Sequence, residues 1–128
     1  MSFLYLAYHH NWSGEPDFRR HWLLLLTSQR GSRIGTSYDV NQDETNVWIL
    51  RIQENHDVSE SGTYQDQVVL GLVDTSKVER LTEPINDVAL PGEGEDCQDW
   101  VKKVVRRLVA EKVAPTRALV SMGVAPSN

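Results

Sequence analysis

Cysteine is nearly absent from this sequence of 128 residues, in which Cys97 is the only one. A single thiol excludes an internal disulfide framework and fits a reducing compartment. Long hydrophobic runs are also missing, because runs such as residues 3–8 and 22–26 are far shorter than the ~20 residues of a membrane-spanning helix. The N-terminus has no basic residues ahead of its apolar ones, so no signal peptide is predicted. We therefore expect a cytoplasmic protein without a membrane partner.

Basic charge is in deficit, with 13 Lys and Arg against 18 Asp and Glu and a net charge of −5. Nucleic acids bind basic surfaces, so this deficit argues against a nucleic-acid partner. The hydrophobic content of 40% is ordinary for a globular protein, and the length suits a single domain over residues 1–128. Adjacent residues on an extended chain point to opposite sides, which makes His9 and His10 a poor metal pair. We expect both histidines at exposed or rim positions, and we expect neither a metal nor a cofactor.

The strongest helical pattern in the chain lies between residues 96 and 111. Its apolar residues have the spacing of one helical face: Trp100, Val101, Val104, Val105, Leu108 and Val109. Cys97 falls in line with this face, on the first turn. Asp96 is a good N-cap, and Asp99 three residues later resembles a capping box. The pattern predicts that Cys97 points toward whatever the helix packs on, beside free N–H groups that favour a thiolate.

Strand patterns dominate residues 1–73. The predicted strands cover residues 3–8, 20–28, 34–40, 47–53 and 67–73. The run at 20–28 is apolar throughout, which predicts a central strand buried on both faces. We expect a polar surface loop at 54–65, a short helix at 75–81, a loop at 84–94, and an edge strand or loose tail at 116–128. The order favours an α+β fold, an antiparallel sheet of about five to six strands with one main helix, carrying Cys97, packed on it.

The sequence leaves two interpretations of Cys97 open. A lone cysteine on an apolar face can be a small buried hydrophobic residue, or it can be a nucleophile if a base lies within reach. His21 opens the central strand and is the histidine best placed to be that base, whereas His56 falls in the polar loop. Asp39 lies on the next strand, and a hairpin can bring it to His21. A helix that lays Cys97 on this sheet would complete a Cys97–His21–Asp39 triad.

These residues also resemble a known group of enzymes. His21-Trp22 followed by leucines resembles the histidine strand of the circularly permuted papain-like thiol enzymes, which include NlpC-type peptidases and the lecithin:retinol acyltransferase group. The motif Asp96-Cys97-Gln98-Asp99-Trp100-Val101 is similar to the Asn-Cys-Gln/Glu-x-Trp/Phe-Val motif of their nucleophile helix. Residues 35–40 resemble the adjoining strand, with Asp39 where these enzymes often have a second histidine. The resemblance covers roughly residues 3–112, is nearest to small fungal proteins, and implies a permuted papain-like fold.

The sequence departs from this family around the thiol. Asp96 replaces the usual asparagine, and Asp39 replaces the second histidine, a change that still suits a Cys–His–Asp site. Glu93, Glu95 and Asp99 add further negative charge, which opposes a thiolate at Cys97. An ion pair with a protonated His21 would have to outweigh them, unless solvent screens these acids.

The first functional hypothesis is a cytosolic cysteine hydrolase or acyltransferase acting on a small soluble acyl, ester or amide metabolite, including secondary-metabolite tailoring. Cys97 would attack the carbonyl, His21 would act as base and then acid, and Asp39 would orient His21. The Cys97 backbone N–H would stabilise the oxyanion together with a donor from Tyr8 or Gln98. We expect Tyr8, Gln98 and the loop residue Trp12 to contact the substrate.

Two alternatives stay open. One is a catalytically inactive binding module on the same fold, with residues 54–66 and the aromatic residues Trp12, Tyr5 and Tyr8 as its contact surface. The other is a non-covalent cyclase or isomerase that uses the pocket without the thiol. Nucleic-acid binding through the basic residues between 102 and 107 is disfavoured, because such residues are typical of the solvated face of an amphipathic helix.

Overall fold

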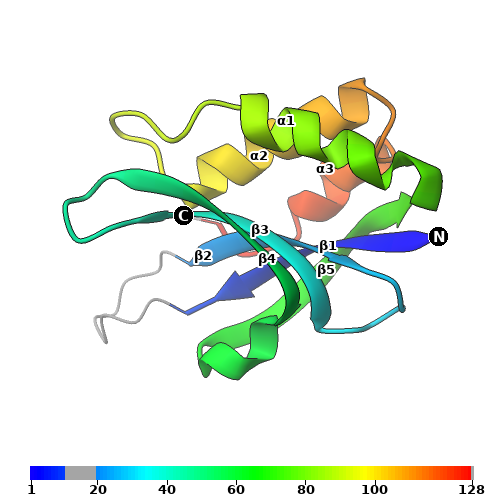
Figure 1. The fold of residues 1–128 in the computed structure, drawn as a ribbon, viewed down its shortest axis with the longest axis horizontal. Coiled ribbons are helices and arrows are strands. Elements are labelled where there is room, and N and C mark those ends of the chain that lie inside the picture. The colour runs from blue at the N-terminus through cyan, green and yellow to red at the C-terminus, as the bar shows by residue number, and fades with distance from the viewer. Residues whose placement is uncertain (11–19, 128) are drawn as a thin grey trace.

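The computed structural model describes residues 1–10 and 20–127, and these form an α+β fold (Figure 1). The strands are β1 Ser2–His9, β2 His21–Thr27, β3 Ile34–Gln42, β4 Trp48–Asp57 and β5 Tyr64–Val73. The helices are the 3-10 turns η1 Val58–Ser61 and η2 Thr75–Leu81, and the α-helices α1 Thr82–Asp87, α2 Cys97–Ala110 and α3 Arg117–Met122. No helix in these ranges has the length and apolar character that a bilayer span needs.

The five strands form one antiparallel sheet in the order β4-β3-β2-β1-β5, which confirms the predicted antiparallel architecture. The apolar run of β2 occupies the centre of this order, and its residues from Trp22 to Leu26 are all buried. A strand without polar positions is stable only where both of its faces are covered. The prediction of a central, doubly buried strand is therefore confirmed.

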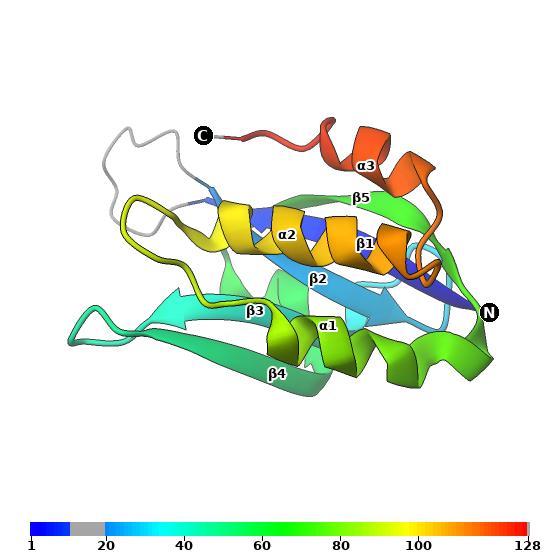
Figure 2. The same ribbon diagram turned by 90° about the horizontal axis from the view of Figure 1, so that it is seen from above.

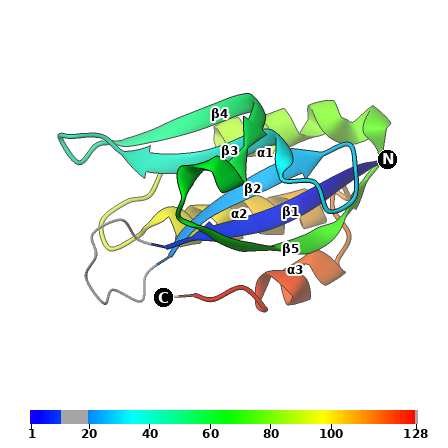
Figure 3. The same cartoon turned by 90° about the horizontal axis from the view of Figure 1, so that it is seen from below.

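The two faces of the sheet are covered by different elements. Helices α1, α2 and α3 lie on one face, as Figures 1 and 2 show, and α2 packs over β2 and β3. The short turn η1 lies on the opposite face, where the chain passes from β4 at one edge to β5 at the other (Figure 3). Side chains of β1 alternate accordingly, because Leu4 and Leu6 join the core under the helices while Tyr5 and Ala7 join Val58 of η1.

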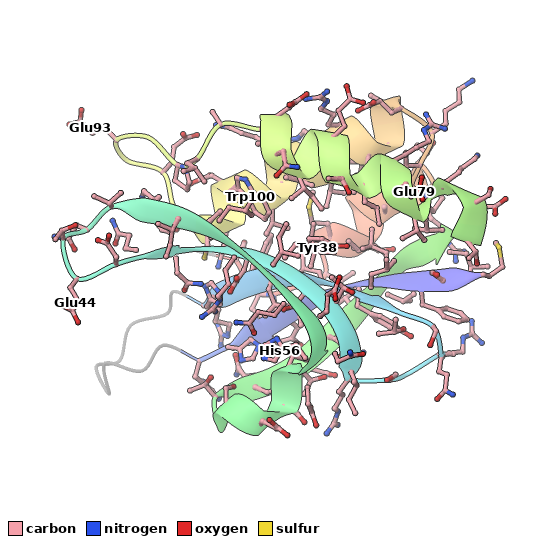
Figure 4. The ribbon with its side chains drawn as sticks, in the orientation of Figure 1. Tyr38, Glu44, His56, Glu79, Glu93 and Trp100 are labelled. Atoms are coloured by element: carbon pink, nitrogen blue, oxygen red, sulfur yellow. The ribbon has the colours of Figure 1, made fainter. Side chains whose placement is uncertain are left out.

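The predicted main helix is confirmed as α2. Asp96 is its N-cap and accepts hydrogen bonds from the backbone of Gln98 and Asp99, while the Asp99 side chain accepts one from the Asp96 backbone. This reciprocal pair is the capping box expected from the sequence. The apolar face is buried from Cys97 to Leu108, and Trp100, which Figure 4 labels on this helix, is 1% exposed. Cys97 is consequently held at the first turn, next to the sheet.

Three predictions for connecting segments are wrong. The expected loop at 54–65 instead extends β4 to Asp57 and then forms η1, because Val58 is fully buried against the sheet and draws the polar segment inward. The expected loop at 84–94 begins as helix α1, with Ile85 buried. Residues 117–122 form helix α3 against β5, where the i, i+4 pair Ala118 and Met122 is buried, so this segment is neither an edge strand nor a loose tail.

The contact between β2 and β3 depends on Gly35. A Cβ atom at this position would lie 2.1 Å from the backbone oxygen of Leu26, which cannot move without breaking the sheet. Overpacking of this kind costs about 1–3 kcal/mol, so we expect Gly35→Ala to lower the free energy of unfolding by that amount in urea titrations. Gly92→Ala is the matched control, because the nearest atom there belongs to the Glu95 side chain at 3.5 Å. Equal stability of the two variants would contradict this account.

Candidate active site

A cavity of about 650 Å³ opens on the sheet face opposite the helices, near the end where β1 stops and β2 begins. It is lined by strands β1 to β4, by η1 and by the start of α2. Its lining includes Cys97, His21 and Asp39, so the structure brings the three predicted catalytic residues to one place. The polar residues that also line it are His9, His10, Arg20, Asn41, Gln42, Arg51, Gln53, His56, Ser61, Thr63 and Asp96.

Cys97 is held at the start of β2 by contacts with one backbone carbonyl. Its Sγ lies 3.9 Å from the oxygen of Arg20, and the side-chain amide of Gln98 donates to the same oxygen at 2.9 Å. Arg20 immediately precedes His21, so these contacts fix the first turn of α2 beside the histidine. Cys97 is 8% exposed and is one of the residues that line the cavity.

His21 lies between the thiol and a carboxylate. Its Nε2 is 2.8 Å from Oδ2 of Asp39, which leaves Nδ1 as the ring nitrogen available to Cys97. Burial alone would lower the pKa of His21, but the hydrogen bond to Asp39 and the interaction with Cys97 raise it to about 9. At neutral pH His21 is therefore an imidazolium ion.

Asp39 is an almost fully buried carboxylate with several donors around it. Besides His21, it accepts hydrogen bonds from Nη2 of Arg51 at 2.9 Å and from Nδ2 of Asn41 at 2.9 Å. Burial would raise the pKa of Asp39, but the hydrogen bonds from His21 and Arg51 lower it to about 2. The carboxylate therefore stays ionised and fixes the His21 ring in one orientation. Arg51 and Asn41 were not predicted, although Arg51 follows from the β3–β4 register, in which it pairs with Asp39.

The acidic residues around the thiol are engaged in other contacts. Asp96 and Asp99 use their carboxylates in the capping box of α2. Glu95 forms an ion pair with Lys103. Figure 4 shows Glu93 at the tip of the loop before α2, pointing away from the fold. The carboxylates that would oppose a thiolate at Cys97 thus interact with backbone N–H groups, with a lysine or with solvent.

His9 lies on the other side of His21, and its predicted exposed position is wrong. It is the last residue of β1, pairs with His21 across the two strands, and is only 6% exposed. The ring centroids of the two histidines are 6.3 Å apart. Burial, together with the positive charge of His21, lowers the pKa of His9 to about 4, so this ring is neutral. The alternation of β1, in which His9 follows Tyr5 and Ala7 on one face, was the signal that could have placed it.

The wall of the cavity also contains two hydroxyl groups beside His9 and a further histidine, His56, which pairs with Ser37. His9 Nδ1 lies 3.2 Å from the hydroxyl of Thr63 and 3.2 Å from that of Ser61. On strands β3 and β4, Nδ1 of His56, which is labelled in Figure 4, is 2.8 Å from the hydroxyl of Ser37. The sequence placed His56 in a loop, but it belongs to β4 and faces away from the helices. Four histidines thus line the cavity, and three of them, His9, His21 and His56, have different hydrogen-bond partners.

Two of the predicted substrate contacts, Tyr8 and Gln98, are not among the described residues that line the cavity. Tyr8 packs toward the helix side of the sheet, as the alternation of β1 requires. Gln98 is 2% exposed and uses its side-chain amide on the Arg20 carbonyl. Trp12 lies outside the described residues. Tyr5, expected on the contact surface of a binding module, is buried and accepts a hydrogen bond from the Gly31 backbone. Neither Tyr8 nor Gln98 is therefore positioned as the second oxyanion donor.

Comparison with known proteins gives a family without an assigned activity. No curated protein and no solved structure matches the chain. The family model described as "Family of unknown function (DUF6540)" matches residues 4–115, a range that contains the whole cavity wall and helix α2. The chain therefore belongs to the DUF6540 family of unknown function.

Proposed function

We propose that the protein is a cysteine hydrolase or acyltransferase in which Cys97 is the nucleophile, His21 the acid and base, and Asp39 the group that orients His21. The observation that carries this proposal is the chain of contacts from Cys97 through the His21 ring to the Asp39 carboxylate, in the wall of one cavity. A nucleophile next to a base that a third group orients is the arrangement that thiol catalysis requires.

In the first half-reaction the Cys97 thiolate attacks the carbonyl carbon of the substrate. A C–S bond forms, and the electron pair of the carbonyl π bond moves to oxygen. When the carbonyl re-forms, the bond to the leaving group breaks and that group takes the proton from Nδ1 of His21. The products of this step are a thioester on Cys97 and a neutral His21.

In the second half-reaction the neutral His21 accepts a proton from water, or from the hydroxyl or amine of an acyl acceptor. The resulting nucleophile attacks the thioester, the C–S bond breaks, and the Cys97 thiolate is restored beside a protonated His21. Asp39 remains ionised throughout, because its pKa of about 2 lies far below that of His21. Water gives a hydrolase, and another acceptor gives an acyltransferase.

The sequence resemblance to the permuted papain-like enzymes supports the same assignment. The order along the chain, histidine strand, polar residue on the next strand, then the cysteine helix, is the order that this resemblance implies. An antiparallel sheet with the cysteine helix packed against its central strands is compatible with a permuted papain-like fold. We extend the proposal to small soluble acyl, ester or amide metabolites in the cytoplasm, because the cavity of about 650 Å³ matches the size of small-molecule sites.

The proposal predicts a reactive thiol at neutral pH. Because His21 keeps its positive charge until the pH rises through about 9, alkylation of Cys97 by iodoacetamide should already be fast at neutral pH. In His21→Ala the rate should instead rise only as the pH passes the ordinary thiol value of ~8.5. The measurement is the alkylation rate against pH, followed by intact mass.

His56→Gln is the matched control, because His56 lines the same cavity but is bonded to Ser37. Its alkylation profile should follow that of the wild type. A wild-type rate that climbs only above pH ~8.5 and is unchanged in His21→Ala would remove the thiol mechanism.

A further inference from the structure

The cavity contains a buried polar atom that the Cys97–His21–Asp39 triad does not use. Among the described residues, Nε2 of His9 is buried and has no hydrogen-bond partner. A buried polar atom without a partner is destabilising, so a ligand atom that pairs with Nε2 in the wall of the cavity would be bound favourably. His9 lines the cavity beside His21, whose Nε2 is bonded to Asp39 on the other side. The unused atom therefore belongs to the same site as the thiol.

The hydroxyl groups behind His9 determine which ring nitrogen carries the proton. Thr63 and Ser61 each have one hydroxyl proton, and their oxygens lie 3.0 Å from one another and 3.2 Å from Nδ1 of His9. If Nδ1 accepts, one hydroxyl donates to the ring and the other donates to the first hydroxyl. If Nδ1 donates instead, the hydroxyl proton of Ser61 is left with the Val58 carbonyl at 3.5 Å, which is a poor hydrogen bond. The geometry assigns the proton to Nε2.

We propose that the N–H at Nε2 of His9 donates a hydrogen bond to the carbonyl oxygen of the substrate and stabilises the oxyanion that forms when Cys97 attacks. This inference rests on the proposed function and adds the oxyanion donor for which Tyr8 and Gln98 are not positioned. The bond strengthens as the carbonyl π electrons move to oxygen, and it weakens when the carbonyl re-forms. No proton is transferred to or from His9.

The surroundings of His9 suit a donor of this kind. A neutral imidazole donates without adding a second positive charge beside His21, and the low pKa of His9, about 4, keeps it neutral during turnover. Preorganised donors act because they need no reorientation at the moment of reaction. Here the hydroxyls of Ser61 and Thr63 lie against Nδ1, and the rings of His9 and Tyr64 pack in a T-shaped arrangement with centroids 5.7 Å apart. These contacts fix the ring of this cavity-lining residue, and Nε2 is the nitrogen that they leave unused.

Acylation and alkylation of Cys97 separate this role from a structural one. Acylation by p-nitrophenyl acetate passes through an oxyanion, whereas alkylation by iodoacetamide displaces iodide and forms none. We expect His9→Leu to lower the acylation rate by about 10²–10³-fold, the usual effect of losing one oxyanion donor, with little change in the alkylation rate. His9→Gln retains an amide donor near Nε2 and should recover much of the acylation rate. The control Val120→Ala changes an exposed residue of α3 that does not line the cavity, and it should leave both rates near those of the wild type.

Each outcome has a definite meaning. A selective loss of acylation in His9→Leu, with recovery in His9→Gln, supports the oxyanion role. Equal losses of acylation and alkylation would show that His9 only supports the fold or His21, and unchanged acylation in both variants would show that Nε2 does not touch the substrate. If the wild type is alkylated normally at neutral pH but never acylated, the His9 proposal fails while the reactive thiol remains. A wild type without thiol reactivity overturns the proposed function as well.

Discussion

Replacing Cys97 by alanine should abolish the covalent intermediate and lower turnover by several orders of magnitude. Cys97 is the only cysteine in the chain, so no other thiol can take its place. Incubation of the wild type with p-nitrophenyl acetate should give a transient mass increase of one acetyl group on Cys97, which clears as His21 activates water. Intact-mass spectrometry against time should show the adduct in the wild type and none in Cys97→Ala.

Cys97→Ser is the matched variant, because it keeps the shape of the side chain and exchanges only sulfur for oxygen. Its hydroxyl is a far weaker nucleophile, so the adduct should also be absent on the same time scale. His21→Gln should keep the nucleophile but slow both the formation and the clearance of the adduct, since one ring serves both half-reactions. Product formation that survives Cys97→Ala would show that the cavity works by shape and polarity, as a non-covalent cyclase or isomerase. Ligand binding without any turnover would identify a binding module.

The sequence was most informative where local pattern and burial agree. The apolar face of α2, its capping box and the position of Cys97 on the first turn all follow from residues within one helix. The continuous apolar run from Trp22 to Leu26 likewise predicted a strand that is covered on both faces, and these residues are buried in the structure. Because His21 opens that strand and Asp39 lies on its neighbour, the meeting of these two residues could be predicted from a hairpin alone.

The sequence was least informative where a few long-range contacts override a polar composition. Residues 54–65 contain little apolar surface, but Val58 inserts under the sheet and brings Ser61 and Thr63 to the wall of the cavity. The burial of His9 depends on the same insertion of Val58, because η1 covers the end of β1. A single buried valine in a polar stretch is too weak a pattern to reveal this. The sequence pattern therefore did not predict His9, which we propose to bind the oxyanion, or the hydroxyl groups of Ser61 and Thr63 beside it.

The groups around His21 in the cavity differ in charge. Asp39 lies on one side as an ion, His9 lies on the other as a neutral ring, and Cys97 approaches from the start of α2. The two histidines are neighbours on paired strands, but their pKa values are driven apart, to about 9 and about 4. Of these two histidines only His21 has a carboxylate partner, and in the mechanism that we propose this asymmetry separates a proton carrier from a fixed donor.

Asp39→Asn should lower turnover by about 10³–10⁴-fold, the effect of removing an orienting carboxylate from a triad. An amide can no longer stabilise the charged His21, so the pKa of His21 should fall from about 9 and the ion pair with Cys97 should be lost at neutral pH. The alkylation profile of Cys97 should therefore move toward that of His21→Ala. The measurements are turnover of an ester substrate and the pH dependence of alkylation.

Asp39 also binds Arg51 and Asn41, so its replacement changes more than the bond to His21, and the control must separate the two effects. Arg51→Gln leaves the Asp39–His21 hydrogen bond in place and removes a partner whose side chain is 48% exposed. Half-exposed ion pairs contribute ~1 kcal/mol or less, so turnover in Arg51→Gln should fall by less than about tenfold. Similar losses in the two variants would mean that Asp39 acts through the stability of β3 and β4. Turnover near that of the wild type in Asp39→Asn would mean that Cys97 and His21 work as a dyad, because a neutral amide would then orient the ring as well as the carboxylate does.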